Sequence, residues 1–235
     1  MSQIEIIHAA NEEEPFLIIN KASGIPSAPL KEGDLSAFSL AADLYPQIKN
    51  IKSKKSVEGG LIHRIDNDTK GLILIAASQS FYDHLCSEQE KGLFTKRYEA
   101  LCCKNECEPD SSYARRNFSV KEGEEIIVKS YFRSYGPKSC QVRPVTEDSG
   151  KYALKKTSSA EYETRICITK KGDFYRARCF LTKGYRHQVR CHLAWCGYPI
   201  SGDRIYNPSS NQKEFLFTAD GLYFSWNGKK YSFEL

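Results

Sequence analysis

Residues 63–71 gather polar and charged side chains immediately before an apolar run, a place where a fold can present reactive groups to a cleft. Within this segment, Asp66 lies between Arg64 and Lys70, and these positive charges favour an ionised carboxylate. Such a carboxylate can act as a nucleophile, a general base or a metal ligand. A capped turn, in which the Asp and Thr side chains bind their own backbone, explains the same residues equally well.

A second polar segment, residues 183–193, combines basic, imidazole and amide side chains. Its pattern predicts a helix over residues 187–196 that ends at Gly197. His187 and Arg190 then share one face of this helix and point toward a site near its N-terminus, which favours anions. A basic surface helix with a hydrogen-bonded core histidine is the alternative.

Tyr98 alternates with charged neighbours in a predicted strand over residues 96–101. Its ring can stack on a nucleic-acid base, or it can lie in the core with its hydroxyl group hydrogen-bonded. The residue type alone favours the core.

The elements that must position these residues follow from the hydrophobic periodicity. Apolar runs and period-two patterns predict strands at 16–20, 71–77, 96–101, 126–132, 141–145, 160–169, 174–181, 215–218, 222–226 and 230–233. Helices are predicted over 34–44, with Asp34 as the N-cap, from about residue 78 or 80 to 91, and over 187–196. Many strands and few helices, without regular βαβ alternation, indicate an α+β fold with a mixed, largely antiparallel sheet and flanking helices.

The charge of the chain is unevenly distributed over its 235 residues, although the formal net charge is only +5. Residues 1–50 hold seven acids and three bases, a net of −4, whereas residues 151–190 hold eleven bases and three acids, a net of +8. Such asymmetry suggests an anionic partner, usually a nucleic acid, although a solvated lysine-rich surface explains it equally well. The longest apolar run, 72–77, is too short to cross a bilayer, and no signal peptide is visible. We therefore expect a cytoplasmic protein without a membrane partner.

The chain has nine cysteines, and this odd number favours reduced thiols over a disulfide framework. Cys102, Cys103 and Cys107 lie close together, but their spacing lacks the further ligands of a zinc site. We therefore expect no bound metal.

Five segments together resemble the RluA-like RNA pseudouridine synthases. The strongest is 63–74, HRIDNDTKGLIL, which is similar to the signature of that family around Asp66. The other segments, in the family's order, are 20–24 (NKASG), 96–100 (KRYEA), 160–164 (AEYET) and 184–206 (GYRHQVRCHLAWCGYPISGDRIY). The resemblance covers residues 15–235. This sequence departs from the pattern at Lys70, where the family usually has Ser, and at Tyr185-Arg186, where it usually has Arg-Thr.

The resemblance implies a pseudouridine synthase catalytic fold that isomerises uridine in ribosomal or transfer RNA without a cofactor. It implies that Asp66 is the catalytic carboxylate, whether it attacks the ring, attacks the sugar or assists elimination. Arg190 would hold Asp66 charged and oriented, and Tyr98 would stack on the flipped base. Arg64 would fill the space that the base leaves or bind its phosphate. The predicted RNA contacts are His63, Arg64, Lys70, Arg186, His187 and Gln188.

Residues 1–235 are expected to form a single catalytic domain with no appended N-terminal RNA-binding domain. We expect a monomer that needs no protein partner. Specificity for one RNA is expected to reside in surface loops such as 102–160, where Tyr135 and its neighbours are candidate contacts.

Two other classes fit parts of the sequence. Residues 66–69, DNDT, are similar to DxDxT, the pattern of magnesium-dependent phosphatases, although the threonine comes one position earlier, and those enzymes need an apolar strand before the first Asp. A non-catalytic RNA-binding module would show the same charge and aromatic residues, but it would not need Asp66, Tyr98 and Arg190 together.

Overall fold

The computed structural model describes residues 3–105, 113–115 and 119–235. The chain forms two compact units. Unit 1 comprises Met1–Lys96 and Thr218–Leu235, and unit 2 comprises Arg97–Phe217. The prediction of one domain over the whole chain stays a prediction.

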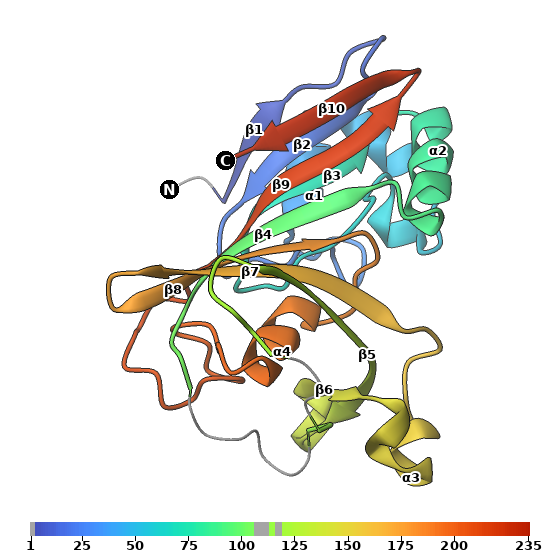
Figure 1. The fold of residues 1–235 in the computed structure, drawn as a ribbon. Helices are drawn as coiled ribbons and strands as arrows, with labels where there is room; N and C mark the ends of the chain where they lie inside the picture. Colours follow the sequence, from blue (N-terminus) through green and yellow to red (C-terminus); the bar gives the residue numbers. More distant parts are fainter. Residues whose placement is uncertain (1–2, 106–112, 116–118) are drawn as a thin grey trace. The chain divides into compact units, whose positions relative to one another are not determined.

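Unit 1 is built on a small mixed sheet with the strand order β1-β2-β3-β9, to which β10 adds by pairing with β9 (Figure 1). The strands are β1 (Ile4–His8), β2 (Phe16–Lys21), β3 (Lys70–Ala76), β9 (Phe217–Trp226) and β10 (Lys229–Glu234). The pairs β1–β2, β2–β3 and β9–β10 are antiparallel, and β3–β9 is parallel. The helices are α1 (Ala37–Leu44), α2 (Gln79–Glu90) and two 3₁₀ turns, η1 (Pro46–Asn50) and η2 (Ser56–Glu58).

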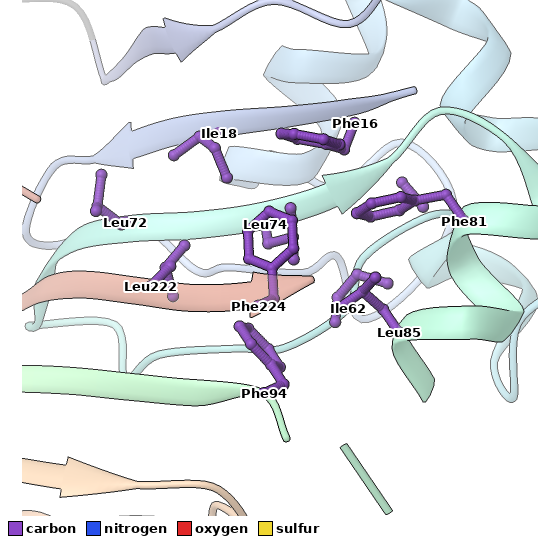
Figure 2. Packing of buried hydrophobic residues seen from close by; sticks show 11 residues of the cluster. Phe16, Ile18, Ile62, Leu72, Leu74, Phe81, Leu85, Phe94, Leu222 and Phe224 are labelled. Carbon is purple, nitrogen blue, oxygen red and sulfur yellow. The ribbon is translucent and has the colours of Figure 1, made fainter. Parts of the chain in front are cut away.

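The core of unit 1 explains why β2 and β3 are apolar throughout. Phe16 on β2 stacks on Phe81 of α2 with ring centroids 4.9 Å apart, and Leu74 of β3 and Phe224 of β9 belong to the same buried cluster (Figure 2). Because both faces of these strands are covered, the sequence shows an apolar run instead of alternation.

Unit 2 contains a second run of strands, in the order β4-β8-β7-β5-β6. The strands are β4 (Thr95–Cys102), β5 (Glu125–Tyr135), β6 (Gln141–Val145), β7 (Tyr162–Lys171) and β8 (Phe174–Leu181). The pairs β5–β6, β5–β7 and β7–β8 are antiparallel. The helices of this unit are α3 (Lys151–Leu154) and α4 (Gln188–Trp195), with the 3₁₀ turns η3 (Pro137–Ser139) and η4 (Glu147–Ser149). The predicted α+β class, with a mixed and mostly antiparallel sheet, is confirmed.

Two predicted element boundaries are wrong. Helix α1 begins at Ala37, because Ser36 and Ser39 form a reciprocal capping box, whereas Asp34 accepts a hydrogen bond from the Lys31 N–H instead. The C-terminal region has one strand, β9, where two were predicted, because residues 218–219 pair with β3 and residues 221–226 pair with β10, so the strand continues without a break. The strands β6 and β8 have the predicted bounds.

Among the described residues, no helix combines the length and the apolar character that a membrane crossing requires.

Candidate functional site

Asp66 lies in a loop, residues 62–69, that leads directly into β3; we call it the Asp66 loop. The Thr69 N–H donates to the Asp66 carbonyl group over 3.1 Å, which closes a turn over residues 66–69. The side chain of Asp66 is half-buried, whereas Asn67 and Asp68 are exposed and Thr69 is buried. The sequence therefore predicted correctly that the carboxylate lies at the entrance of a strand.

The Asp66 loop is held by the segment that follows β2. The Gly24 N–H donates to the Asn67 carbonyl over 2.8 Å, and the Ser23 hydroxyl donates to the Asp68 carbonyl over 2.6 Å. Ser27 contacts Ile65 twice, donating to its carbonyl at 2.7 Å and accepting from its N–H at 3.1 Å. These contacts fix the backbone on both sides of Asp66, a form of preorganisation that a reactive side chain needs.

Lys21 is the buried centre of this arrangement, with 0% of its surface exposed. Its ammonium group donates to the carbonyls of Ala22 at 2.9 Å, Ile25 at 2.8 Å and Asn67 at 2.9 Å. Burial lowers the pKa of Lys21 from 10.5 to about 8, against the opposing charges of Asp68 and Asp66. A positive charge therefore lies inside unit 1 behind the loop.

The three other predicted residues of this segment lie in different environments. His63 Nε2 accepts from the Leu74 N–H at 3.2 Å, and its ring meets Phe94 edge-on at 5.4 Å between centroids. Burial, and then the charge of Lys96, lower the pKa of His63 to about 3, so the ring is neutral at physiological pH. Its predicted RNA contact stays a prediction, although one ring nitrogen is already used within the fold.

Arg64 and Lys70 are both exposed. Arg64 Nη1 lies 2.6 Å from Glu58 Oε1, so its guanidinium group has an ion pair at the surface. Lys70 is the first residue of β3. Their exposure leaves both side chains accessible to an anionic ligand.

In unit 2, Arg190 lies on α4 and is only 4% exposed. Its Nε and Nη2 atoms each lie 2.8 Å from one carboxylate oxygen of Asp203, which is 1% exposed. Asp203 also accepts from the backbone N–H groups of Ile205 at 2.9 Å and Tyr206 at 3.1 Å. The bidentate pair fixes the guanidinium plane of Arg190. The sequence prediction missed this carboxylate, and the predicted pairing of Arg190 with Asp66 stays a prediction.

Helix α4 is not the basic surface helix that was weighed as an alternative, because its residues are almost all buried. Gln188 donates to the Glu163 carbonyl and the Thr164 hydroxyl, both at 2.9 Å. His187, with a left-handed backbone of φ 55°, lies at the N-cap, and its Nδ1 is 3.3 Å from the Tyr206 hydroxyl. The predicted RNA contacts of these two side chains stay predictions.

Two further predicted residues contact other parts of unit 2. Arg186 is exposed and donates from Nη2 to the Ser139 and Gln141 carbonyl groups, which flank the start of β6. Tyr98 is buried on β4 and stacks on Phe217, with ring centroids 5.3 Å apart and an interplanar angle of 15°. The ring of Tyr98 is thereby held in a defined plane.

The cysteine cluster is described only in part. Cys102 is buried, which raises its thiol pKa well above the usual value, and Cys103 Sγ lies 3.2 Å from the Ser201 hydroxyl. Cys107 lies outside the described residues. Within residues 3–105, 113–115 and 119–235, no three His, Cys, Asp or Glu side chains gather as a metal site would require.

The sequence profile of the family described as RNA pseudouridylate synthase matches residues 15–195, more than half of the chain. The chain belongs to this family. It is 28% identical over 204 residues to ribosomal large subunit pseudouridine synthase D of Buchnera aphidicola, a match that covers 87% of this chain and 56% of the relative. An uncharacterized RNA pseudouridine synthase of Bacillus subtilis, YlyB, is 26% identical over 214 residues, with 90% and 60% covered. The chain thus spans little more than half the length of these relatives.

Two solved structures of human proteins share the fold of this pseudouridylate synthase family member. Human RNA pseudouridylate synthase domain containing 1 matches with a TM-score of 0.67 at 13% identity, covering 99% of this chain and 82% of the human chain. Human RNA pseudouridylate synthase domain containing 4 matches with a TM-score of 0.63 at 17% identity, covering 98% and 87%. At this level of identity, the similarity shows the shared fold.

Lys21 and Asp203 are two residues of this family member whose contacts were not predicted from the sequence. Both belong to segments that carry the resemblance to the family, but the sequence predicted a role for neither. A signal existed for Lys21, because a lysine that ends the apolar strand FLIIN is in an unusual place for a charge. Asp203 follows a glycine and had no comparable signal.

Proposed function

We propose that this chain is an RNA pseudouridine synthase that isomerises uridine in ribosomal or transfer RNA, with Asp66 as the catalytic carboxylate. The observation that carries the proposal is the position of Asp66, half-buried in a loop whose backbone is held on both sides by residues 21–27. Membership of the RNA pseudouridylate synthase family supports the choice of reaction.

The reaction exchanges one glycosidic bond for another. The N1–C1′ bond breaks, the C5–C1′ bond forms, C5 loses a proton and N1 gains one. Substrate and product are isomers, so the chemistry consumes no oxidant or reductant, and the proposal requires no cofactor. Asp66 acts on the ring or the sugar, or it assists departure of the uracil; a carboxylate can serve each of these routes.

The remaining roles are proposed residue by residue. Tyr98, whose plane is fixed by Phe217, would stack on the flipped uracil. Arg190, whose guanidinium group is oriented by Asp203, would supply positive charge to the uridine pocket. Arg64 and Lys70 are exposed and would contact RNA phosphates. We further propose that the protein acts in the cytoplasm as a monomer.

The phosphatase alternative has no structural support. Residues 62–65, which precede the DNDT segment, form a loop, and the apolar strand β3 follows the segment instead. An aspartyl-phosphate enzyme of that class needs the strand before its first Asp.

The decisive experiment compares Asp66→Asn with Asp68→Asn in cells that lack the wild-type gene. Asp68 is a matched control, because it lies two residues away in the same loop and its carboxylate is exposed. Carbodiimide mapping of pseudouridine in total RNA should show sites that are lost with Asp66→Asn and retained with Asp68→Asn. The affinity of the Asp66→Asn protein for RNA should stay within a few-fold of wild type. Persistence of every site in the Asp66→Asn cells would remove Asp66 from catalysis.

A further inference from the structure

A cavity of about 350 Å³ lies in unit 2, against the β5–β6 hairpin. Its size falls at the lower end of the range of about 300–1,000 Å³ that is typical of small-ligand sites. Its described lining includes three arginines but only one aspartate, together with two tyrosines: Arg115, Arg133, Arg143, Asp148, Tyr113 and Tyr135. The lining is therefore positively charged and aromatic. None of these residues belongs to the set proposed for catalysis.

The register of the hairpin places two of the arginines directly opposite each other. Arg133 on β5 pairs with Arg143 on β6, so both side chains leave the same face of the sheet. Like charges at opposed positions of an antiparallel pair destabilise the sheet. Arg143 is also only 9% exposed, so its side chain lies within the wall of the cavity. An arrangement of this kind is typical of a site that receives an anion.

The tyrosines orient the buried arginine. The Arg143 guanidinium carbon lies 3.4 Å from the centroid of the Tyr135 ring and 5.2 Å from that of Tyr113, both within cation–π range. Stacking fixes the plane of the guanidinium group, and a fixed planar fork matches the oxygens of a phosphate group. Tyr135 itself stays 39% exposed, so part of its ring is accessible to a ligand.

We propose that this cavity binds a phosphodiester group of single-stranded RNA, with the adjacent base against Tyr135. The arginines would neutralise the phosphate, and an unpaired base would stack on the ring, as in other proteins that bind single strands. The inference rests on the proposed function only for the choice of RNA as the carrier of the phosphate. It also gives a physical reason for the expected contact between Tyr135 and RNA.

The test measures binding of a fluorescein-labelled oligouridylate of about ten nucleotides by fluorescence anisotropy over a range of salt concentrations. Arg133→Gln removes one charge from the half-buried wall of the cavity. Lys121→Gln is the matched control, because it removes one charge from an exposed position outside the cavity. Arg133→Gln should weaken binding about tenfold and lower the salt slope by about 0.7, the value for one phosphate contact on a single strand.

Tyr135→Leu provides a second variant that leaves the charge unchanged. It should weaken binding about tenfold, because it removes the ring on which the base stacks and which orients Arg143. Lys121→Gln should stay within about twofold of wild type in affinity. The inference is wrong if neither Arg133→Gln nor Tyr135→Leu, with circular dichroism unchanged, binds more weakly than Lys121→Gln.

Two further arms identify the ligand and separate this inference from the proposed function. Uridine monophosphate and inorganic phosphate are added as competitors; if either displaces the oligonucleotide at comparable concentration, the site is for a small phosphate and the RNA inference fails. The Asp66→Asn protein should bind the oligonucleotide as wild type does. If Arg133→Gln loses binding while the wild-type protein forms no pseudouridine, the proposed function fails and the RNA cavity stands.

Discussion

Replacing Lys21 by Met tests whether one buried ammonium group holds the Asp66 loop in place. Methionine keeps the unbranched shape and most of the length of the side chain but removes the three hydrogen bonds to the carbonyls of Ala22, Ile25 and Asn67. The Asn67 carbonyl is the important partner, because it lies next to Asp66 in the chain. Lys31→Met is the control, since Lys31 is an exposed lysine of the same unit.

The size of the effect follows from two opposing contributions. Three hydrogen bonds from a charged donor contribute about 1.5 kcal/mol each at the low end, or roughly 4–5 kcal/mol together. The fall of the Lys21 pKa from 10.5 to about 8 indicates that burial costs the charged form roughly 2–3 kcal/mol, with allowance for solvent screening. We therefore expect Lys21→Met to lower the free energy of unfolding by about 2 kcal/mol, a large part of the stability of a typical domain. Pseudouridine formation should fall roughly 10- to 100-fold, because the loop loses its fixed position.

The assay is urea denaturation of the wild-type, Lys21→Met and Lys31→Met proteins between pH 7 and about pH 10.5, the unperturbed lysine pKa. Between pH 8 and 10.5, the unfolded Lys21 keeps a proton that the folded residue has lost, so the unfolded state binds more protons. The contribution of Lys21 to stability therefore becomes more favourable as the pH rises through this window. A Lys21→Met protein with the midpoint and pH dependence of the Lys31→Met control would refute the reasoning.

Three other substitutions test separate parts of the fold. In Gly71→Ala, the new Cβ would overlap the Ala219 carbonyl group of β9, and the backbone φ of +129° is unfavourable for alanine. The free energy of unfolding should therefore fall by about 3 kcal/mol or more. An unchanged melting temperature would contradict the close approach of the two strands. Asp203→Ala removes the bidentate carboxylate of Arg190 and should cost about 3–5 kcal/mol in urea denaturation, whereas a shift below about 1 kcal/mol would show that the pair is unimportant for stability. Burial lowers the pKa of His192 from 6.5 to about 3, so the unfolded state takes up an extra proton as the pH falls through this window, and stability drops by about 1.4 kcal/mol per pH unit. His192→Gln should remove that part of the acid slope, and an identical slope in both proteins would place the titration elsewhere.

Local patterns were enough to predict most of the strands and the position of Asp66. The alternation in β8 and the apolar run in β3 reflect how each strand buries its faces, and this depends on neighbouring residues in the sequence. The polar segment at residues 63–71 was also visible in the sequence, because it immediately precedes the apolar run that forms β3. The capping box of α1 was missed because Asp34 and Ser36 are both acceptable N-caps, and only the path of the chain selects one.

The sequence by itself therefore determined that Asp66 lies at the entrance of a buried strand, with the signature of its family around it. Only the tertiary structure determined which residues hold the Asp66 loop in place and which side chains lie next to the buried arginines. Lys21 reaches Asn67 from 46 positions away, and Arg133 meets Arg143 only because the β5–β6 register opposes them. The physical reason is that periodicity reports which face of an element is buried, whereas the partner of a buried charge is set by contacts between segments far apart in the chain.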